Sequence, residues 1–201
     1  MKKSTVIIRF ASIVSLLILL GFASYYFFIF ARCFFVSKDI VPFYSVSLMR
    51  VMVYGKSPES MSAHISLIDS SGKEFAVIDR SWSNSSLYIE FSSASFKEKE
   101  IYFPIRIYSG RYLSSGRMVA GRGLDLTRYY MDGDECSFVS AHDSKEHKSA
   151  VGAFAVFAVS QSKKFQSRFS RIRTINISDL QDAAVYEVVI GSNGSLNVYR
   201  M

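Results

Sequence analysis

The residues of this sequence that could do chemistry are most concentrated between positions 132 and 147. These 16 positions hold eight side chains of metal-ligating types: Asp132, Asp134, Glu135, Cys136, His142, Asp143, Glu146 and His147. A metal site needs such groups to converge from a fixed backbone. The spacing fits no specific ligand pattern, because Asp132-Gly133-Asp134 lacks the alternating ligands and the final Glu of a calcium loop. We expect a solvated polar loop around positions 142–149 and keep Asp132, Asp134, His142 and His147 only as weak metal candidates.

Two further motifs resemble catalytic ones but lack what the chemistry needs. Gly116 to Gly123 has the first spacing of a phosphate-binding loop, but Arg122-Gly123 stands where Lys and Ser or Thr are required. Ser-x-x-Lys pairs, in which a lysine could activate a serine, occur at Ser70/Lys73 and Ser160/Lys163. Two pairs are what chance gives in a chain with 34 serines and 11 lysines. The three histidines show no triad pattern, so we expect no catalytic residues, no cofactor and no enzymatic activity.

The basic residues are distributed in a way that indicates a membrane anchor. The formal net charge is +7, but Lys2, Lys3, Arg9 and Arg32 flank an uncharged run, and all 17 acidic residues come after it. The remaining positions, 33–201, carry 20 basic and 17 acidic residues, which is ordinary for a folded domain. Nucleic acid is therefore not an expected partner.

The uncharged run covers residues 10–31, which is 22 residues. As a helix it would reach about 33 Å, against a hydrocarbon core of about 30 Å. More basic residues precede the run than follow it closely, so we expect a cytoplasmic N-terminus and an extracytoplasmic C-terminal domain at an inner or plasma membrane. A signal peptide cleaved after Ala23 is the alternative, since Gly21 and Ala23 are small.

The expected organisation is a short cytoplasmic tail (1–9), a transmembrane helix (10–31), a juxtamembrane connector (32–44) and a β-rich domain (45–201). Alternating or β-rich runs predict strands at 45–54, 87–93, 100–109, 117–120, 126–130 and 137–141, and hairpins at 64–79 and 183–200. Ser70-Ser71-Gly72 should form the turn of the first hairpin and Asn193-Gly194 that of the second. Pro104 predicts an edge or a bulge. The apolar run 151–160 predicts a central strand, with a helix as the lesser alternative.

Two stretches favour helical structure: 163–173 predicts a helix, and 177–181 predicts a short turn with Ser178 as a candidate N-cap. The basic residues of the first are candidates for contact with an anionic lipid surface: Lys163, Lys164, Arg168 and Arg171. The fold class is mainly β: an N-terminal transmembrane helix, then an antiparallel β-sandwich, jelly-roll or partly open barrel with one or two short helices.

The expected function rests only on the combination of a membrane anchor and a β-rich domain. We expect a non-enzymatic accessory or scaffold subunit of a cell-envelope assembly, with the lipid bilayer and membrane or envelope proteins as partners. The alternative is a lipid or lipoprotein carrier with an apolar groove in the β domain. The interior of the sandwich discriminates between the two: a continuous apolar cleft would support the carrier, and a filled core with an exposed edge would support the scaffold. Cys33 and Cys136 could pair in an oxidising compartment or remain as free or buried thiols.

Overall fold

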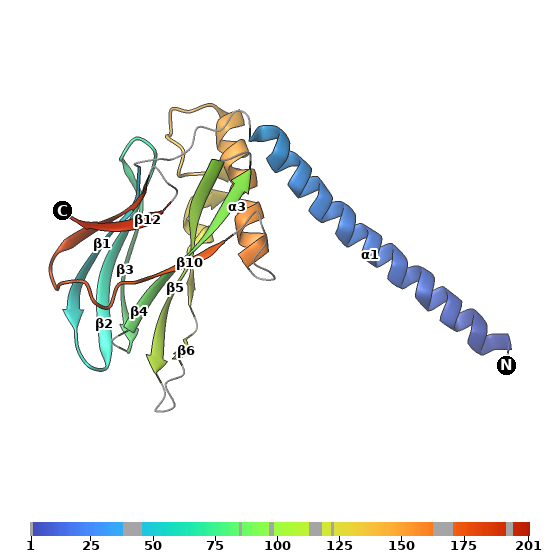
Figure 1. The fold of residues 1–201 in the computed structure, drawn as a ribbon, viewed down its shortest axis with the longest axis horizontal. Coiled ribbons are helices and arrows are strands. Elements are labelled where there is room, and N and C mark those ends of the chain that lie inside the picture. Colours follow the sequence, from blue (N-terminus) through green and yellow to red (C-terminus); the bar gives the residue numbers. More distant parts are fainter. Residues whose placement is uncertain are drawn as a thin grey trace.

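The structure is a computed structural model that describes residues 2–37, 46–84, 86–96, 99–112, 118–121, 123–162, 171–191 and 195–201. It begins with the 35-residue helix α1 (Lys2–Val36), which extends from a β-rich domain as a long rod (Figure 1). Apart from Tyr26, every residue from Arg9 to Phe28 is exposed. In the described part of the chain, α1 is the one helix long and apolar enough to cross a membrane, a property that signal sequences share.

Two antiparallel sheets form the domain. Sheet A has the order β12-β11-β1-β2-β3 and contains β1 (Ser47–Lys56), β2 (Ser60–Ile68), β3 (Glu74–Ser83), β11 (Val185–Ile190) and β12 (Leu196–Arg200). Sheet B has the order β10-β4-β5-β6 and contains β4 (Ser86–Phe96), β5 (Lys99–Tyr112), β6 (Met118–Ala120) and β10 (Ile172–Asn176), with β7 (Leu124–Asp125) also paired to β5. The smaller elements are α2 (Thr127–Tyr130) and the hairpin of β8 (Met131–Asp132) and β9 (Glu135–Cys136). The mainly β fold is as predicted.

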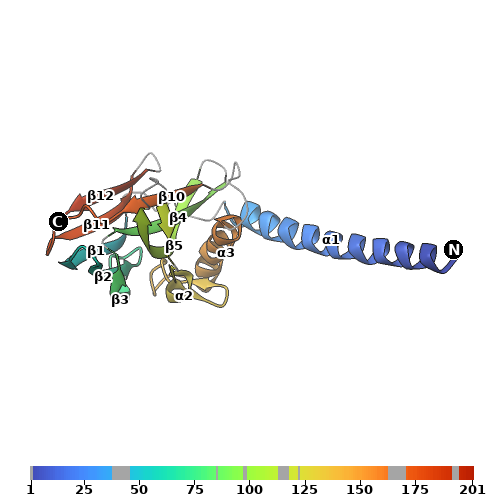
Figure 2. The same cartoon turned by 90° about the horizontal axis from the view of Figure 1, so that it is seen from below.

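The helix α3 (Lys145–Ser162) makes a third layer, on the face of sheet B that is turned away from sheet A (Figures 1 and 2). Ser92 of β4 donates a hydrogen bond from its hydroxyl to the Ala158 carbonyl of α3, at 2.9 Å. Phe96 packs edge-on against Phe154 and Phe157, with ring centroids 5.2 and 4.9 Å apart. Sheet B is therefore covered on both faces, and every residue of β4 from 87 to 94 is buried.

The side chains of both sheets fill the space between them. In β1 the buried residues alternate at Met49, Val51 and Val53, while the residues between them point outward to a more exposed face. Sheet A contributes Met61, Ile65, Leu67, Trp82 and Val188 to the same hydrophobic cluster that contains Leu87, Ile89 and Phe91 of sheet B. The two sheets thus share one core.

Several local predictions are confirmed. β1 covers most of 45–54, β4 and β5 cover 87–93 and 100–109, and β6 covers 118–120 of the stretch 117–120. The first hairpin turns at Ser70-Ser71-Gly72, where Gly72 has a φ of +83°. A register shift in the β4–β5 pair pairs Phe91 with Pro104 but Glu90 with Arg106, which is the predicted bulge. β11 and β12 form the second hairpin, whose Asn193-Gly194 turn lies outside the described residues.

The prediction of a central strand at 151–160 is wrong, because this stretch is the middle of α3. The helix begins after Ser144, whose hydroxyl accepts a hydrogen bond from the His147 N–H at 3.2 Å. The solvated loop predicted at 142–149 is accordingly helical from Lys145 onward. Sheet B, the β8–β9 hairpin and α1 cover α3 on several sides, so the run has no polar stripe to reveal a helical period.

Three further predictions are also wrong, and a fourth is confirmed in part. Residues 127–130 form α2 rather than a strand, because the Asp125 carboxylate accepts a hydrogen bond from the Thr127 N–H at 2.9 Å. The strand predicted at 137–141 ends earlier, at Cys136. Ile172 and Arg173 belong to β10 rather than to a helix, and residues 163–170 lie outside the described part. Residues 177–181 form the predicted short turn, but the Ser178 hydroxyl accepts a hydrogen bond from the Leu87 N–H at 2.8 Å, so Ser178 holds β4 instead of acting as an N-cap.

At Gly152 the β8–β9 hairpin crosses close to α3. A Cβ atom there would lie 2.0 Å from the Asp134 carbonyl oxygen and 2.9 Å from its carbon, which is inside van der Waals contact. These atoms belong to backbone and cannot move aside as a flexible side chain would. The small residue is therefore a condition for the hairpin to reach α3.

We predict that Gly152→Ala lowers the free energy of unfolding by about 1 to 3 kcal/mol, because overpacking outweighs the gain of about 1 kcal/mol in helix propensity. The measurement is urea unfolding of the full-length protein in detergent micelles. Gly55→Ala is the control, since its Cβ would meet Ser62 only at 3.4 Å. A Gly152→Ala protein as stable as the parent would mean that the hairpin does not pack here.

Candidate functional site

The structure does not gather the metal candidates into one site. Asp132 lies on β8, Asp134 at the turn between β8 and β9, His142 before α3 and His147 in its first turn. Among the described residues, no three His, Cys, Asp or Glu side chains lie close enough together to hold a metal ion. Asp132 and Asp134 in fact face different surroundings, a polar pocket and the end of α1.

The Ser-x-x-Lys and glycine-rich motifs have structural roles where they are described. The Ser70 hydroxyl accepts a hydrogen bond from the Ser140 N–H at 2.9 Å, which ties the β2–β3 turn to the segment before α3. The Ser160 hydroxyl donates to the Phe157 carbonyl within α3 at 2.8 Å. The Gly121 N–H donates to the Ser109 carbonyl at 2.7 Å. The described groups thus make hydrogen bonds that hold the chain together, while Gly116, Arg122 and Lys163 of these motifs lie outside the described residues.

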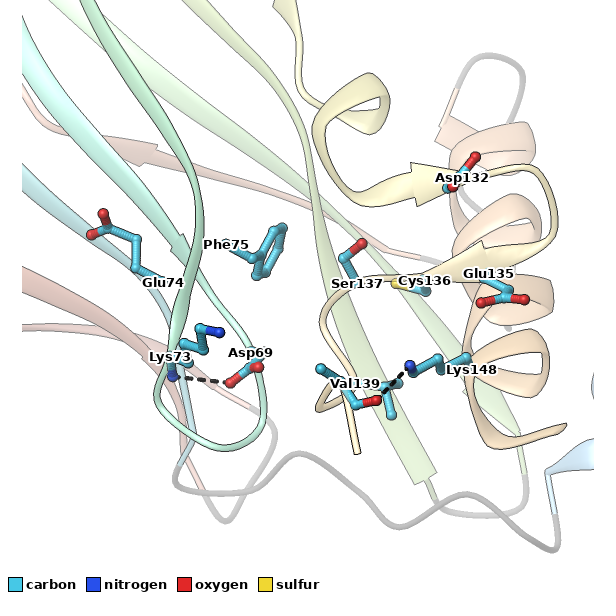
Figure 3. A pocket seen from close by; sticks show the side chains of 11 residues that line it. Asp69, Lys73, Glu74, Phe75, Asp132, Glu135, Cys136, Ser137, Val139 and Lys148 are labelled. Atoms are coloured by element: carbon cyan, nitrogen blue, oxygen red, sulfur yellow. Dashed lines mark hydrogen bonds between the residues drawn. The ribbon is translucent and has the colours of Figure 1, made fainter. Parts of the chain in front are cut away.

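A polar pocket of about 470 Å³ lies between the β2–β3 turn and the β8–β9 hairpin (Figure 3). Its charged lining consists of Asp69, Lys73, Glu74, Asp132, Glu135 and Lys148. Burial alone would raise the pKa of Asp69, but hydrogen bonds from the Ser71 hydroxyl and from the Lys73 and Ser71 N–H groups outweigh it and hold that pKa below its usual value. Asp69 is therefore an ionised carboxylate that organises the turn.

The lysine and the cysteine that line this pocket are also constrained by their surroundings. Lys148 donates from Nζ to the Ala141 carbonyl at 2.9 Å. Burial raises the pKa of Cys136 to about 12, so its sulfur is a protonated thiol rather than a nucleophilic thiolate. The pocket combines carboxylates and ammonium groups and suits a small polar ligand, but the described side chains that line it include no activated nucleophile.

A second site is the junction at which the last turns of α1 pack onto α3. The Phe30 ring lies 5.4 Å from that of Phe96 and 6.4 Å from that of Phe157, measured between centroids. Cys33 is fully buried, and its Sγ donates to the Ala153 carbonyl at 3.3 Å. The partners in α3 run from Phe157 toward the start of that helix as α1 proceeds from Phe30 to Cys33, so the two helices run in opposite directions where they pack.

Arg32 adds the polar part of this junction. Its Nη2 donates to the Ser149 hydroxyl at 2.6 Å, and its Nη1 lies 3.6 Å from Oδ2 of Asp134. The residue predicted to flank a membrane span therefore also binds the domain, through α3 and through the β8–β9 turn. The small side chains at Ser149, Gly152 and Ala153 allow α1 and the β8–β9 turn to come close to α3. Their spacing could have indicated a packed helix, but the strand prediction for this stretch took no account of it.

The remaining predicted site residues lie apart from both sites. Lys2 and Lys3 are in the first turn of α1, and Arg9 is exposed. Arg171 has an exposed side chain, while its backbone N–H donates to the Ser93 hydroxyl at 3.1 Å and thereby joins β10 to β4. The other candidates for lipid contact lie outside the described residues: Lys163, Lys164 and Arg168. Cys33 and Cys136 are both free and buried, as the thiol alternative anticipated.

We predict that the junction stabilises the domain measurably. A chain beginning at Ser24 keeps Phe30, Arg32 and Cys33, whereas a chain beginning at Lys38 loses all three and exposes the side of α3 that they cover. The free energy of unfolding should be lower in the shorter chain by about 2 to 4 kcal/mol. Urea unfolding in mild detergent measures it. Equal stability of the two chains would show that α1 contributes nothing to the domain.

Three comparisons with known proteins found no match to this chain among protein-family models, curated proteins or solved structures.

Proposed function

We propose that this chain is a single-pass membrane protein and a non-enzymatic accessory or scaffold subunit of a cell-envelope assembly. The observation that carries the proposal is the junction. α1 passes without a break from an exposed apolar segment into contacts with α3, so the domain is held in one orientation on its anchor. A scaffold needs such a fixed orientation to present the same surface to a partner.

The exposed segment of α1 has the dimensions of a span. From Phe10 to Phe28 it contains 19 residues, which is about 28 Å of helix against a hydrocarbon core of about 30 Å. Arg9 precedes it and Arg32 follows it, at positions suited to the two headgroup regions. The excess of Lys and Arg on the N-terminal side supports a cytoplasmic N-terminus and an extracytoplasmic domain.

The interior of the sandwich favours a scaffold over a lipid carrier. Buried side chains from both sheets fill the space in which a carrier would hold its ligand. The two edge strands of sheet A offer surfaces for a protein partner instead. β3 is one end strand and exposes Val77, and β12 is the other and exposes Tyr199. Edge strands bind partners by pairing with a strand of the partner or through side-chain contacts.

The topology can be tested with the two native thiols as internal controls, because both are buried. We predict that Ser83→Cys, at an exposed position of β3, reacts with a membrane-impermeant maleimide in intact cells. Ser4→Cys should react only after the cells are permeabilised. Labelling in the reverse order would contradict the orientation. A Ser4→Cys protein whose mature chain never reacts and begins at Ser24 would show that the segment is cleaved.

The scaffold role can be tested by placing a photo-crosslinking amino acid at Val77 or at Tyr199 in the full-length protein in its native membrane. We expect discrete adducts with one or two membrane or envelope proteins from an edge position. The control position is Glu146, which is exposed at the start of α3 and away from both edges. Identical adducts from all three positions, or none with protein and stoichiometric lipid in the purified chain, would contradict the role.

A further inference from the structure

A groove of about 190 Å³ lies on the junction, on the side where α1 leaves the domain. From α1 it is lined by Tyr25, Phe28, Ile29 and Arg32, which share one face of the helix at spacings of three and four residues. Gly152, Ala153 and Val156 of α3 form the opposite wall, with Asp134 at the rim. We refer to these residues as the junction groove.

The junction groove is apolar at one end and charged at the other. Tyr25 and Phe28 are more than half exposed, at 57% and 66%, and Val156 is the one large apolar residue of α3 that is exposed, at 36%. Along α1 the next turn brings Arg32, whose side chain is 35% exposed. The charged end thus holds the Arg32–Asp134 ion pair, and an occupant with an apolar part and an anionic group would compete with Asp134 for Arg32.

We propose that the junction groove binds a membrane phospholipid, with a segment of one acyl chain between the two helices and the phosphate at Arg32. The proposal rests on the proposed function, since it requires α1 to cross a bilayer. The apolar wall formed by Tyr25 and Phe28 is continuous with the exposed surface that begins at Phe10. Lipid therefore meets the groove without leaving the surface of the span.

The depth of the groove agrees with this occupant. If the hydrocarbon core begins next to Arg9, about 20 residues of helix bring its other boundary close to Ile29. The hydrocarbon region therefore reaches its outer boundary near Phe28, and lipid headgroups lie near Arg32. The volume is below the roughly 300 to 1,000 Å³ typical of small-molecule sites, so it suits part of one chain rather than an entire ligand.

The charge of Arg32 favours a phosphate. A guanidinium carries five N–H donors in a planar fork that matches phosphate oxygens. The contacts that hold Arg32 are one hydrogen bond to Ser149 and an ion pair with Asp134, whose side chain is 75% exposed. An exposed ion pair of this kind contributes little, so a phosphate can displace or join the carboxylate.

The test uses the full-length protein in vesicles of equal parts phosphatidylcholine and phosphatidylglycerol, with a trace of either lipid carrying a photoactivatable acyl chain. Mass spectrometry then locates the labelled residues. We expect labelling to be enriched at Val156 and Phe28. Val156→Trp, which fills the groove, should lower that enrichment by about tenfold or more. Tyr54→Trp, which places the same side chain at an exposed position of β1 away from both α1 and the edges of sheet A, should leave it unchanged.

Two further variants test the phosphate. Arg32→Gln should abolish the preference for phosphatidylglycerol over phosphatidylcholine in groove labelling, Arg32→Lys should keep most of it, and Arg50→Gln, at an ion pair on sheet A, should not alter it. Uniform labelling along Phe10–Phe28 that Val156→Trp does not change would overturn the lipid site while leaving the anchor intact. A complete lack of labelling between Leu16 and Leu20 would instead overturn the proposed function.

Discussion

The arrangement of this protein depends on the close packing of α1 against α3. Phe30 and Cys33 reach a part of α3 that is already covered on its other side by sheet B. The helix that emerges from the domain is thus bound to the third layer of the fold rather than tethered by a flexible segment. Everything proposed about the orientation of the domain, and about lipid beside it, follows from this contact.

The same contact explains why α3 has its composition. A helix covered by a sheet, a hairpin and another helix can have few polar residues and must be narrow where backbones approach. Gly152 meets the β8–β9 turn, Ala153 meets Cys33, and Ala158 accepts a hydrogen bond from β4. The small residues mark three different neighbours on three sides of one helix.

Much of the fold could be predicted from the sequence because its signals are local. Gly72 marks its turn by its own conformation, and Pro104 marks a bulge because it lacks an N–H. Residues 151–160 could not be assigned in this way, since alternation and helical period both disappear when nearly every residue of a run is apolar and buried. The junction could not be predicted from the sequence for another reason. Arg32 and Ser149 are 117 residues apart, and only the folded chain brings them together.

A helix that packs directly on a domain can transmit its tilt to that domain. When the hydrophobic length of a span exceeds the local bilayer thickness, the span responds by tilting, at a cost of fractions of a kcal/mol per Å of mismatch. If α1 crosses a membrane as proposed, its tilt would be passed to α3 through the contacts of Phe30, Arg32 and Cys33. Membrane thickness would therefore set the angle at which sheet A, in the layer farthest from α1, faces its surroundings (Figure 2).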